Sequence, residues 1–525
     1  MTFTPITQYD QAADSDPANG RIAAYVLSSI FLFLGLAAIS LLVFNVTSNA
    51  VIRAVLDWDT ASPDPAPSLI LAFLSEFGII LPVLILGAGV AFIWLGFRVR
   101  GRHITTGRWV HIAAMWLTIG SVGLAFLNAV QGLSAKPDTP VNIGGIVFPL
   151  IAAGGFAMIY IWLNRSMGRI FRGQEDYMAR ETRVAWNMLI PTLAVFIIVA
   201  ARPLEQTFIR SLTDKRFAGQ SIPQFVGLEN YQSLLGIRLD TVTCRWDEEA
   251  SACVTRNDGS IRWESIDRGL LEEGYRTVWT IQLPFGERAQ ALAISSLDDD
   301  FLQGIGTTLV FAAISVTLEL LIALFMAVTV NSEFAGRGLM RAVMLIPWAI
   351  PTVISARLWE LMLKDTTAGI INRVLMDMHI IDVSKAWLSD VTLQLPAAIM
   401  VDVWKTAPFM ALLLLAGLQT IPKDLYEAAS VDGASRIRQF FSVTLPLLRP
   451  TIGVALVFRT LDALRVFDLF NVLFGRQQLT MATYDYETLV NNQRDGYASA
   501  VSMIIFLLIA VFALIYVRLL NVETE

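Results

Sequence analysis

Apolar stretches of about 20 residues recur along the chain, and shorter segments rich in charged side chains separate them. An α-helix of that length spans the hydrocarbon core of a bilayer. The pattern predicts an all-α polytopic membrane protein with about ten transmembrane helices. They lie near residues 22–46, 78–97, 109–130, 143–163, 184–203, 305–330, 341–362, 393–418, 447–472 and 497–519.

The first of these stretches is too long for the apolar core of a signal peptide. Its flank carries Asp10, Asp14 and Asp16 where a signal peptide has basic residues. We therefore expect this helix to be retained.

One polar segment, residues 205–304, is long enough to fold outside the membrane. Two β-prone runs, Cys253–Arg256 and Ser260–Ile266, flank Asn257-Asp258-Gly259, which is typical of a hairpin turn. Thr277–Leu283 is a further possible strand. We expect a small, partly β subdomain here rather than a tether.

The composition agrees with a membrane protein. The 525 residues are 55% hydrophobic and 16% charged, and the mean hydropathy is +0.58. The net charge of −6 is explained by residues 205–304, which hold sixteen acidic and ten basic side chains. This distribution argues against nucleic acid as a partner.

Basic residues in short loops mark the cytoplasmic side of a membrane protein. Loops 98–108 and 164–183 carry nine arginines, whereas loops 47–77 and 131–142 carry one basic residue each. Both termini are therefore expected in the cytoplasm. By counting helices, the long polar segment lies outside, and the loop around Glu427 lies inside.

Both cysteines of the chain, Cys244 and Cys253, fall in the outer segment. An oxidising outer compartment favours a disulfide between them, and two free thiols are the alternative.

No pattern of enzyme chemistry stands out in the sequence. His103, His111 and His379 are scattered without other metal ligands, and there is no G-x-x-x-x-G-K-[ST] phosphate loop. We expect no metal site, no bound cofactor and no ATP hydrolysis by this chain.

The segment between the eighth and ninth predicted helices has an unusual spacing. It reads Glu427-Ala428-Ala429, three residues, Gly433, nine residues, and then Val443-Thr444-Leu445-Pro446. Pro422 suits the first turn of a helix, and Gly433 can end that helix. Small residues at 428 and 429 would let another surface approach closely.

A second short helix is expected at Ser435–Phe441, with Arg436 and Arg438 outward and Phe440 and Phe441 inward. An interfacial amphipathic loop could have the same composition.

The Glu427–Pro446 spacing resembles the EAA loop of ABC-importer permeases, in which a short helix docks on a separate ATPase. Other segments resemble the maltose-type (MalFG-like) carbohydrate permeases, in the trehalose and α-glucoside branch. The resemblance covers about residues 184–520. Its segments are Ala185–Pro203 with Phe208–Asp214, Phe225–Tyr231 (F-x-G-L-x-N-Y), Leu345–Pro351, Trp387–Asp390 and Phe458–Asp468.

The sequence departs from the family in two places. Gly475-Arg476-Gln477-Gln478 stands where members often have Gly-Gly-Gly-Pro, and four N-terminal helices exceed the core. We expect those four helices to pack against the core and to fix its first helix.

The resemblance implies a six-helix core and four parts of the chain. Residues 1–183 are an N-terminal four-helix membrane extension, and 184–204 are the first core helix. Residues 205–304 are a periplasmic subdomain. Residues 305–525 are the permease core, with a coupling loop at 419–446. By resemblance, the residues that face the ATPase are Glu427, Ala428, Ala429, Asp432, Gly433, Arg436, Leu445 and Pro446.

Charged residues inside spans point to a polar pathway or to paired structural groups. Polar residues recur every three positions on the ninth predicted helix, which predicts one slanted ridge with ion pairs at i, i+3. Such a ridge suits sugar hydroxyls, and an ion-paired seam against a partner permease is the alternative. Candidate pathway residues are Arg459, Asp462, Arg465, Asp468, Asn471, Asp402, Trp404, Lys405 and Trp359.

Other charges and rings in the spans are less specific. Glu319 stands alone in the sixth predicted helix. Rings could stack on a sugar, although packing or interfacial anchoring is the more frequent role. The charged group in the seventh helix is Arg357, Glu360 and Lys364, and the further rings are Trp348 and Phe409.

The resemblance implies a permease subunit of an ATP-driven, binding-protein-dependent importer in a bacterial inner membrane. Its cargo would be an α-linked disaccharide or oligosaccharide such as maltose, trehalose or an α-glucoside. Its partners would be a smaller second permease, two copies of an ABC ATPase that bind ATP and Mg, a periplasmic sugar-binding protein and the lipid bilayer. The alternatives are an ABC permease for glycerol phosphate or a polyamine, and an ion-coupled secondary transporter.

Overall fold

A computed structural model gives the fold of the chain. It describes residues 17–48, 78–134, 143–172, 177–217, 223–248, 252–256, 260–283 and 289–519. The chain falls into two compact units, Met1–Ile209 and Arg210–Glu525.

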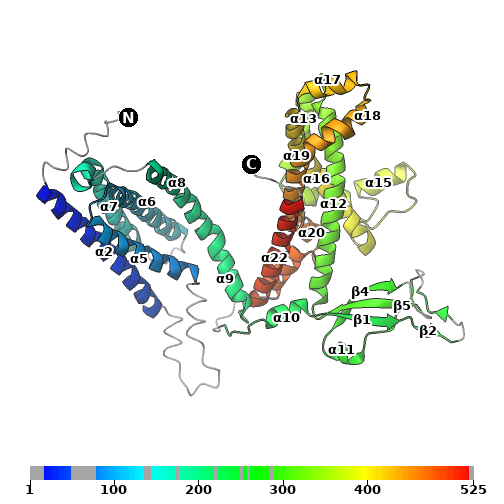
Figure 1. Ribbon diagram of the computed structural model, residues 1–525. Helices are drawn as coiled ribbons and strands as arrows, with labels where there is room; N and C mark the ends of the chain where they lie inside the picture. The colour runs from blue at the N-terminus through cyan, green and yellow to red at the C-terminus, as the bar shows by residue number, and fades with distance from the viewer. Residues whose placement is uncertain are drawn as a thin grey trace, which may run out of the picture. The chain divides into compact units, whose positions relative to one another are not determined.

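Unit 1 contains two pairs of packed membrane helices. Helix α2 (Pro17–Ser48) packs along α5 (Ile80–Val99), and α6 (Ile104–Ser134) packs along α7 (Ile143–Ile170) (Figure 1). Buried apolar side chains from all four helices form one core, for example Phe31, Val99, Val110 and Leu163. The described residues therefore confirm helices in the predicted N-terminal extension.

Two local features explain how this bundle closes. A Cβ on Gly35 of α2 would lie 2.6 Å from the carbonyl oxygen of Gly89 in α5, so glycine permits this close crossing. Arg102 is 8% exposed, and it donates to the carbonyl oxygens of Ile170 at 2.6 Å and Arg169 at 3.0 Å. These carbonyls end α7 and have no partner within the helix. Arg102 thus stabilises the fold of unit 1.

The predicted helix 184–203 lies within a longer helical run. It consists of α8 (Tyr177–Phe196), the π-helical η1 (Ile197–Ala201) and α9 (Arg202–Ser211). Pro203 has no N–H to donate, and a wider π turn next to a proline accommodates the lost hydrogen bond.

Unit 2 begins with a small β subdomain, as predicted. Its main sheet is antiparallel with the order β1-β5-β4, and α11 (Arg268–Glu272) packs on one face through Leu270. The short pair β2–β3 forms a second sheet. The strands are β1 (Ile237–Thr243), β2 (Trp246–Asp247), β3 (Ala252–Cys253), β4 (Arg276–Leu283) and β5 (Gln290–Ser296).

The predicted strand at 277–283 is confirmed by β4. The predicted hairpin is supported by the antiparallel bridge between Thr255 and Ile261, whereas its turn, 257–259, lies outside the described residues. Strands β1, β2 and β5 were not predicted.

The disulfide between Cys244 and Cys253 is present. It closes a loop of about ten residues, and a link of that size stabilises the fold by about 2–3 kcal/mol in the chain-entropy account. We expect the C244S/C253S double variant to expose the 205–304 segment to limited proteolysis several-fold faster than the parent. A reductant should accelerate cleavage of the parent to the same rate, and should leave the double variant unchanged. Equal cleavage of both proteins without reductant would contradict this expectation.

The rest of unit 2 is a bundle built around α12 (Asp299–Asn331), α16 (Val391–Gln419) and α19 (Leu445–Ala463), whose buried residues form the largest core. Helix α22 packs on α19 and α21. The remaining elements are α10 (Glu229–Leu235), α13 (Arg337–Ala349), α14 (Thr352–Met362), α15 (Ile370–Asp377), α17 (Lys423–Val431), α18 (Arg436–Gln439), η2 (Phe440–Thr444), α20 (Asp468–Leu473), α21 (Met481–Tyr486), η3 (Glu487–Asn491) and α22 (Asp495–Leu519).

Among the described residues, eight helices are long and apolar enough to cross a membrane, and the bent pair α13–α14 would make a ninth. With the α8–α9 run, these helices account for all ten predicted segments. The prediction of a polytopic helical membrane protein is confirmed.

Two of the predicted helices are broken. Helices α13 and α14 meet at 89°, because Pro351 cannot continue the helix and holds Ile350 in an extended conformation. The predicted ninth helix ends at Ala463, and α20 begins at Asp468. Its start also differs, because the helix runs without a break from Arg436 through η2 into α19, so that Leu445 and Pro446 lie inside it.

The F-x-G-L-x-N-Y segment fixes the start of unit 2. Asn230, 9% exposed, donates to the carbonyl oxygens of Ser211 at 2.8 Å and Thr213 at 3.0 Å. The hydroxyls of Tyr231 and Ser211 lie 2.6 Å apart. A Cβ on Gly496 at the start of α22 would lie 1.9 Å from the carbonyl oxygen of Thr213, so this contact requires glycine.

We expect Gly496→Ala to lower the free energy of unfolding by about 1–3 kcal/mol, because the added methyl group has no room beside a backbone atom. Denaturant titration in detergent measures this change. Gly338→Ala is the matched control, since no atom lies within 4 Å of the position that its added methyl group would take. Equal stability of the two variants would show that the Gly496 contact is not tight.

The Trp387–Asp390 segment has a structural role in unit 2. The indole of Trp387 donates to Asn372 at 2.9 Å, and the backbone N–H of Leu388 donates to Asp365 at 2.9 Å. Asp390 caps the N-terminus of α16. These bonds order the connection between α14 and α16.

Candidate functional site

Helix α12 connects the two ends of unit 2. It begins directly after β5, and its C-terminal end reaches the loop that contains α17 and α18 (Figure 1). A helix of 33 residues is about 50 Å long, which exceeds the thickness of the hydrocarbon core. The β-sheet end and the α17 end therefore lie beyond opposite faces of a bilayer that α12 crosses.

The 419–446 loop presents two short helices whose side chains are not buried. Glu427, Ala428, Asp432 and Gly433 are all exposed in this chain, as a docking surface requires. Large apolar side chains are exposed as well, with Val431 88%, Ile437 74% and Phe441 61% exposed. Exposed apolar side chains grouped with charged ones are typical of a surface that binds another protein.

The outward position of Phe441 contradicts the prediction that both phenylalanines point inward. The helical run from Arg436 into α19 passes through the π turn η2, which shifts the face that each residue presents. Val431 and Ile437 were also missed, although an isolated valine and isoleucine in a polar loop were a visible signal.

Hydrogen bonds within the loop fix its shape. The Tyr426 hydroxyl lies 3.1 Å from the Thr444 hydroxyl, and the Gln439 amide donates to Ser430 at 2.9 Å. Gly433 has φ +77°, a left-handed conformation that glycine adopts without strain, and it ends the first helix as predicted. These bonds hold the two short helices of the loop together as one unit.

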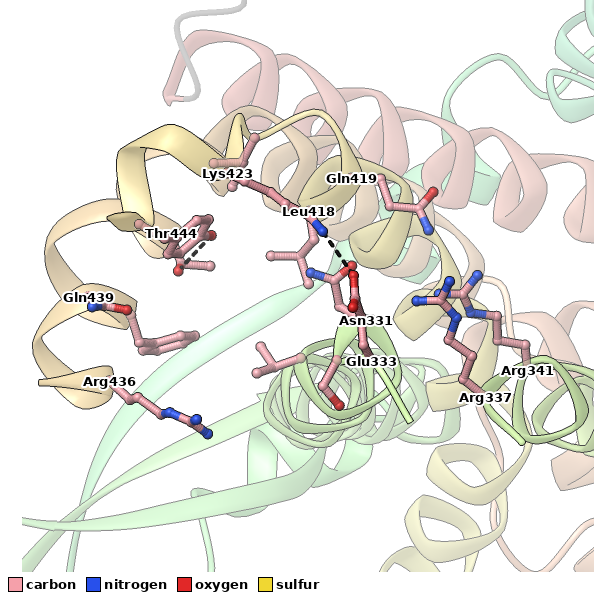
Figure 2. Close-up of a pocket in the computed structure, with 15 residues that line it drawn as sticks. Asn331, Glu333, Arg337, Arg341, Leu418, Gln419, Lys423, Arg436, Gln439 and Thr444 are labelled. Carbon is pink, nitrogen blue, oxygen red and sulfur yellow. Dashed lines mark hydrogen bonds and ion pairs between the residues drawn. The ribbon is translucent and has the colours of Figure 1, made fainter. Parts of the chain in front are cut away.

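A cavity of about 700 Å³ lies between this loop and the junction of α12 with α13 (Figure 2). Its lining includes four cationic side chains and one carboxylate. Lys423 from α17 donates to Glu333 beyond the end of α12 at 2.8 Å. This hydrogen bond lowers the pKa of Glu333 and raises the pKa of Lys423. The cationic side chains are Arg337, Arg341, Lys423 and Arg436.

A buried ionic cluster lies deeper in unit 2 and joins α12, α16 and α19. The Arg459 guanidinium donates to Glu319 and to Asp402, each through Nη2 at 2.7 Å, and to Asp462 through Nη1 at 2.7 Å. Glu319 is 0% exposed, Arg459 4% and Asp402 9%, whereas the side chain of Asp462 is 61% exposed. The hydroxyl of Thr406 donates to Glu319 at 2.7 Å.

The structure corrects the prediction for Glu319 and gives the partners of two other groups of charged residues in the spans. Glu319 does not stand alone, because it pairs with Arg459. Asp402 pairs with Arg459, whereas the ammonium group of Lys405 donates to the carbonyl oxygen of Ile350 at the break between α13 and α14. Of the charged group predicted in the seventh helix, Arg357 and Glu360 form an ion pair at 2.7 Å on α14, whereas Lys364 lies beyond the end of that helix.

The predicted polar ridge is divided between three segments. Arg459 and Asp462 lie on α19, Arg465 lies in the connection, and Asp468 and Asn471 lie on α20. Asp462, Arg465 and Asn471 are exposed, whereas Arg459 is buried. A continuous ridge along one helix is therefore wrong, because the chain turns after Ala463.

Aromatic side chains pack in pairs near the bent span. The ring centroids of Trp348 and Phe409 lie 4.8 Å apart in a stacked arrangement, and those of Trp359 and Trp404 lie 5.4 Å apart, edge to face. Trp404 is 39% exposed, so it can still contact a ligand. No group of three or more His, Cys, Asp or Glu side chains suited to a metal ion occurs in the part of the chain that the structure describes.

Comparisons with known proteins find several similar chains. A family profile described as "Binding-protein-dependent transport system inner membrane component" matches residues 319–521. The chain is 43% identical over 348 residues to the trehalose/maltose transport system permease protein MalF of Thermococcus litoralis, and the match covers 65% of this chain and 94% of that protein. It is 32% identical over 361 residues to the trehalose transport system permease protein SugA of Mycobacterium tuberculosis, with 68% and 94% covered.

Among solved structures, a bacterial ABC transporter involved in the import of the acidic polysaccharide alginate aligns with 66% of this chain and 98% of its own chain. The sequence identity is 20% and the TM-score is 0.47.

Proposed function

Because the chain belongs to the permease family of binding-protein-dependent ABC transporters, in the trehalose/maltose branch, we propose that it is one of two permease subunits of an α-glucoside importer. Its cargo is an α-linked disaccharide or oligosaccharide such as trehalose, maltose or another α-glucoside. The names of MalF and SugA support this cargo class.

The main observation behind the proposed mechanism is the 419–446 loop at one end of α12 and α19. The loop is exposed, and hydrogen bonds within it hold its two helices together. This loop docks in a cleft of a separate ABC ATPase, which binds ATP and Mg and hydrolyses the nucleotide. Glu427, Ala428, Ala429, Asp432, Gly433 and Arg436 form its contact surface. Leu445 and Pro446 lie inside the helical run that carries the motion into α19.

The sugar pathway follows residues that remain accessible beside the buried cluster. Asp462, Arg465 and Asn471 supply hydrogen-bond partners for hydroxyl groups, and the Trp359–Trp404 pair supplies aromatic faces. Arg459 and Asp402 hold the helices together beneath this surface, and Lys405 holds the bent span. Alternating access then results when the ATPase moves α19 relative to α12 and α16.

The assembly needs further subunits, since one coupling loop serves one ATPase. A smaller homologous permease supplies the second loop, two ATPase copies bind the two loops, and a sugar-binding protein docks at the β-sheet end of this chain. The 419–446 loop and both termini lie in the cytoplasm, and the β subdomain lies outside the inner membrane. The arginine-rich loops of unit 1 support this orientation.

The test is to purify the chain from its native membrane, identify the subunits that accompany it, and measure ATPase activity with the sugar-binding protein present. We expect an ABC ATPase to co-purify and trehalose or maltose to stimulate hydrolysis. Absence of any ATPase subunit would overturn the mechanism. Stimulation by glycerol phosphate or a polyamine instead of a sugar would overturn the cargo class.

A further inference from the structure

The cavity beneath the 419–446 loop has more positive charge than its own acidic residue can neutralise. Of the lining side chains, Arg337, Arg341, Lys423 and Arg436 are cationic and Glu333 alone is anionic. Glu333 is bound to Lys423 at 2.8 Å. The ion pairs among the described residues include none of the three arginines.

Two of these arginines have an unfavourable spacing on the same helix. Arg337 and Arg341 are four residues apart on α13, about one helical turn, and both line the cavity (Figure 2). Like charges at this spacing destabilise a helix. Arg337 is also the first residue of α13, where the helix dipole is positive, and no acidic residue occurs in that turn.

Arg341 has a donor without an acceptor. Its Nη2 donates to the carbonyl oxygen of Val330 at the end of α12 at 3.1 Å, which fixes the side chain. Its Nε is buried and has no hydrogen-bond partner in the described structure. A buried donor in a cavity that two further guanidinium groups line is the arrangement that an anion with several oxygens would satisfy.

We propose that this cavity binds a phosphate group, with Arg337, Arg341 and Arg436 as its ligands. Guanidinium groups match phosphate oxygens in a two-bond geometry, and three of them from two sides favour a phosphate over a single carboxylate. A volume of about 700 Å³ also has room for the organic part of a phosphate ester.

The phosphate has two possible sources, which share this chemistry. The cavity lies at the end of the membrane helices α12 and α16, where the headgroup of an anionic phospholipid can enter from the adjacent leaflet. A soluble phosphate ester can enter from the aqueous side. Either ligand would tie α13 to α18 and so hold the 419–446 loop. The binding itself does not depend on whether the loop docks on an ATPase.

Two binding measurements on the full-length chain distinguish the sources. The first is native mass spectrometry after reconstitution in phosphatidylcholine with a small fraction of phosphatidylglycerol, which reports retained anionic lipid. The second is equilibrium dialysis of the chain in neutral detergent against radiolabelled inorganic phosphate. We expect at least one probe to bind, and Arg337→Gln to weaken that binding about tenfold or more.

Two further variants distinguish loss of the binding site from misfolding of the chain. Glu333→Gln removes the repulsive carboxylate and frees Lys423, so it should strengthen binding threefold or more. Arg449→Gln, at an exposed arginine of α19 outside the cavity, should leave binding unchanged. If the chain retains the anionic lipid but does not bind inorganic phosphate, the ligand is a lipid headgroup. If it binds inorganic phosphate in the dialysis, the ligand is a soluble phosphate. Binding of neither probe, or equal binding by the parent, Arg337→Gln and Glu333→Gln, would overturn the proposal.

Discussion

Replacement of Arg459 by methionine is expected to lower the free energy of unfolding by about 3–5 kcal/mol and to abolish transport. The physical reason is that Glu319 and Asp402 are both buried and both depend on this one guanidinium. Removal of one partner of a buried ionic network leaves charges without compensation, which costs about 3–5 kcal/mol. Denaturant titration in detergent measures the loss, and transport is measured in reconstituted vesicles.

The matched control is Arg465→Met, a residue of the same polar series that lies exposed in the connection after α19. Exposed substitutions usually change stability by about 0.5 kcal/mol or less, so this variant should unfold like the parent. The triple variant R459M/E319Q/D402N should recover part of the lost stability, because it removes the buried charges together. If Arg459→Met were as stable as Arg465→Met, the cluster would not hold the helices together.

The helical architecture could be predicted because each span is encoded locally. Apolar stretches of sufficient length, the cap at Pro422 and the glycine at position 433 all act within a few residues of their effect. The break at Pro351 was also visible in principle, since the residue before a proline avoids the helical conformation. The break at 464–467 had no such signal, because no proline or glycine occurs there.

The ionic cluster could not be predicted from spacing, because its partners are far apart in the chain. Arg459 and Glu319 are separated by 140 residues, and Arg459 and Asp402 by 57. Of the ion pairs that Arg459 forms in this cluster, the i, i+3 spacing predicted only the pair with Asp462. The available signal was energetic, since a lone carboxylate and a lone guanidinium in separate spans are each too costly to remain unpaired.

The strand β5 was also missed, because contacts with distant residues rather than its local sequence determine it. Its sequence, Gln290–Ser296, is rich in alanine and serine, which have low β propensity. Ala291 and Ala293 are 0% exposed, and small side chains there leave room for Leu270 and Val242 on the same face. Packing in the subdomain, rather than local preference, selects this strand.

The second large effect is expected for the 419–446 loop, whose helices α17 and α18 are exposed. Glu427→Ala is expected to weaken binding of the ATPase subunit about 30-fold or more and to abolish sugar-stimulated hydrolysis, since a central interface residue contributes about 2 kcal/mol or more. The same change should leave the unfolding midpoint of the isolated chain unaltered, because α17 buries none of its residues. Co-purification with the ATPase and thermal unfolding measure the two outcomes separately.

A second variant tests whether the apolar part of the loop also belongs to the contact surface. Val431 is 88% exposed, so Val431→Asp places a charge where an interface would exclude water and should impair ATPase binding at least as much as Glu427→Ala. Asp377→Ala is the matched control, since Asp377 is an exposed acid on α15, before α16 and outside the 419–446 loop. If both loop variants retained the ATPase as well as Asp377→Ala does, the loop would not be the coupling element. The force that moves α19 would then have to enter unit 2 elsewhere.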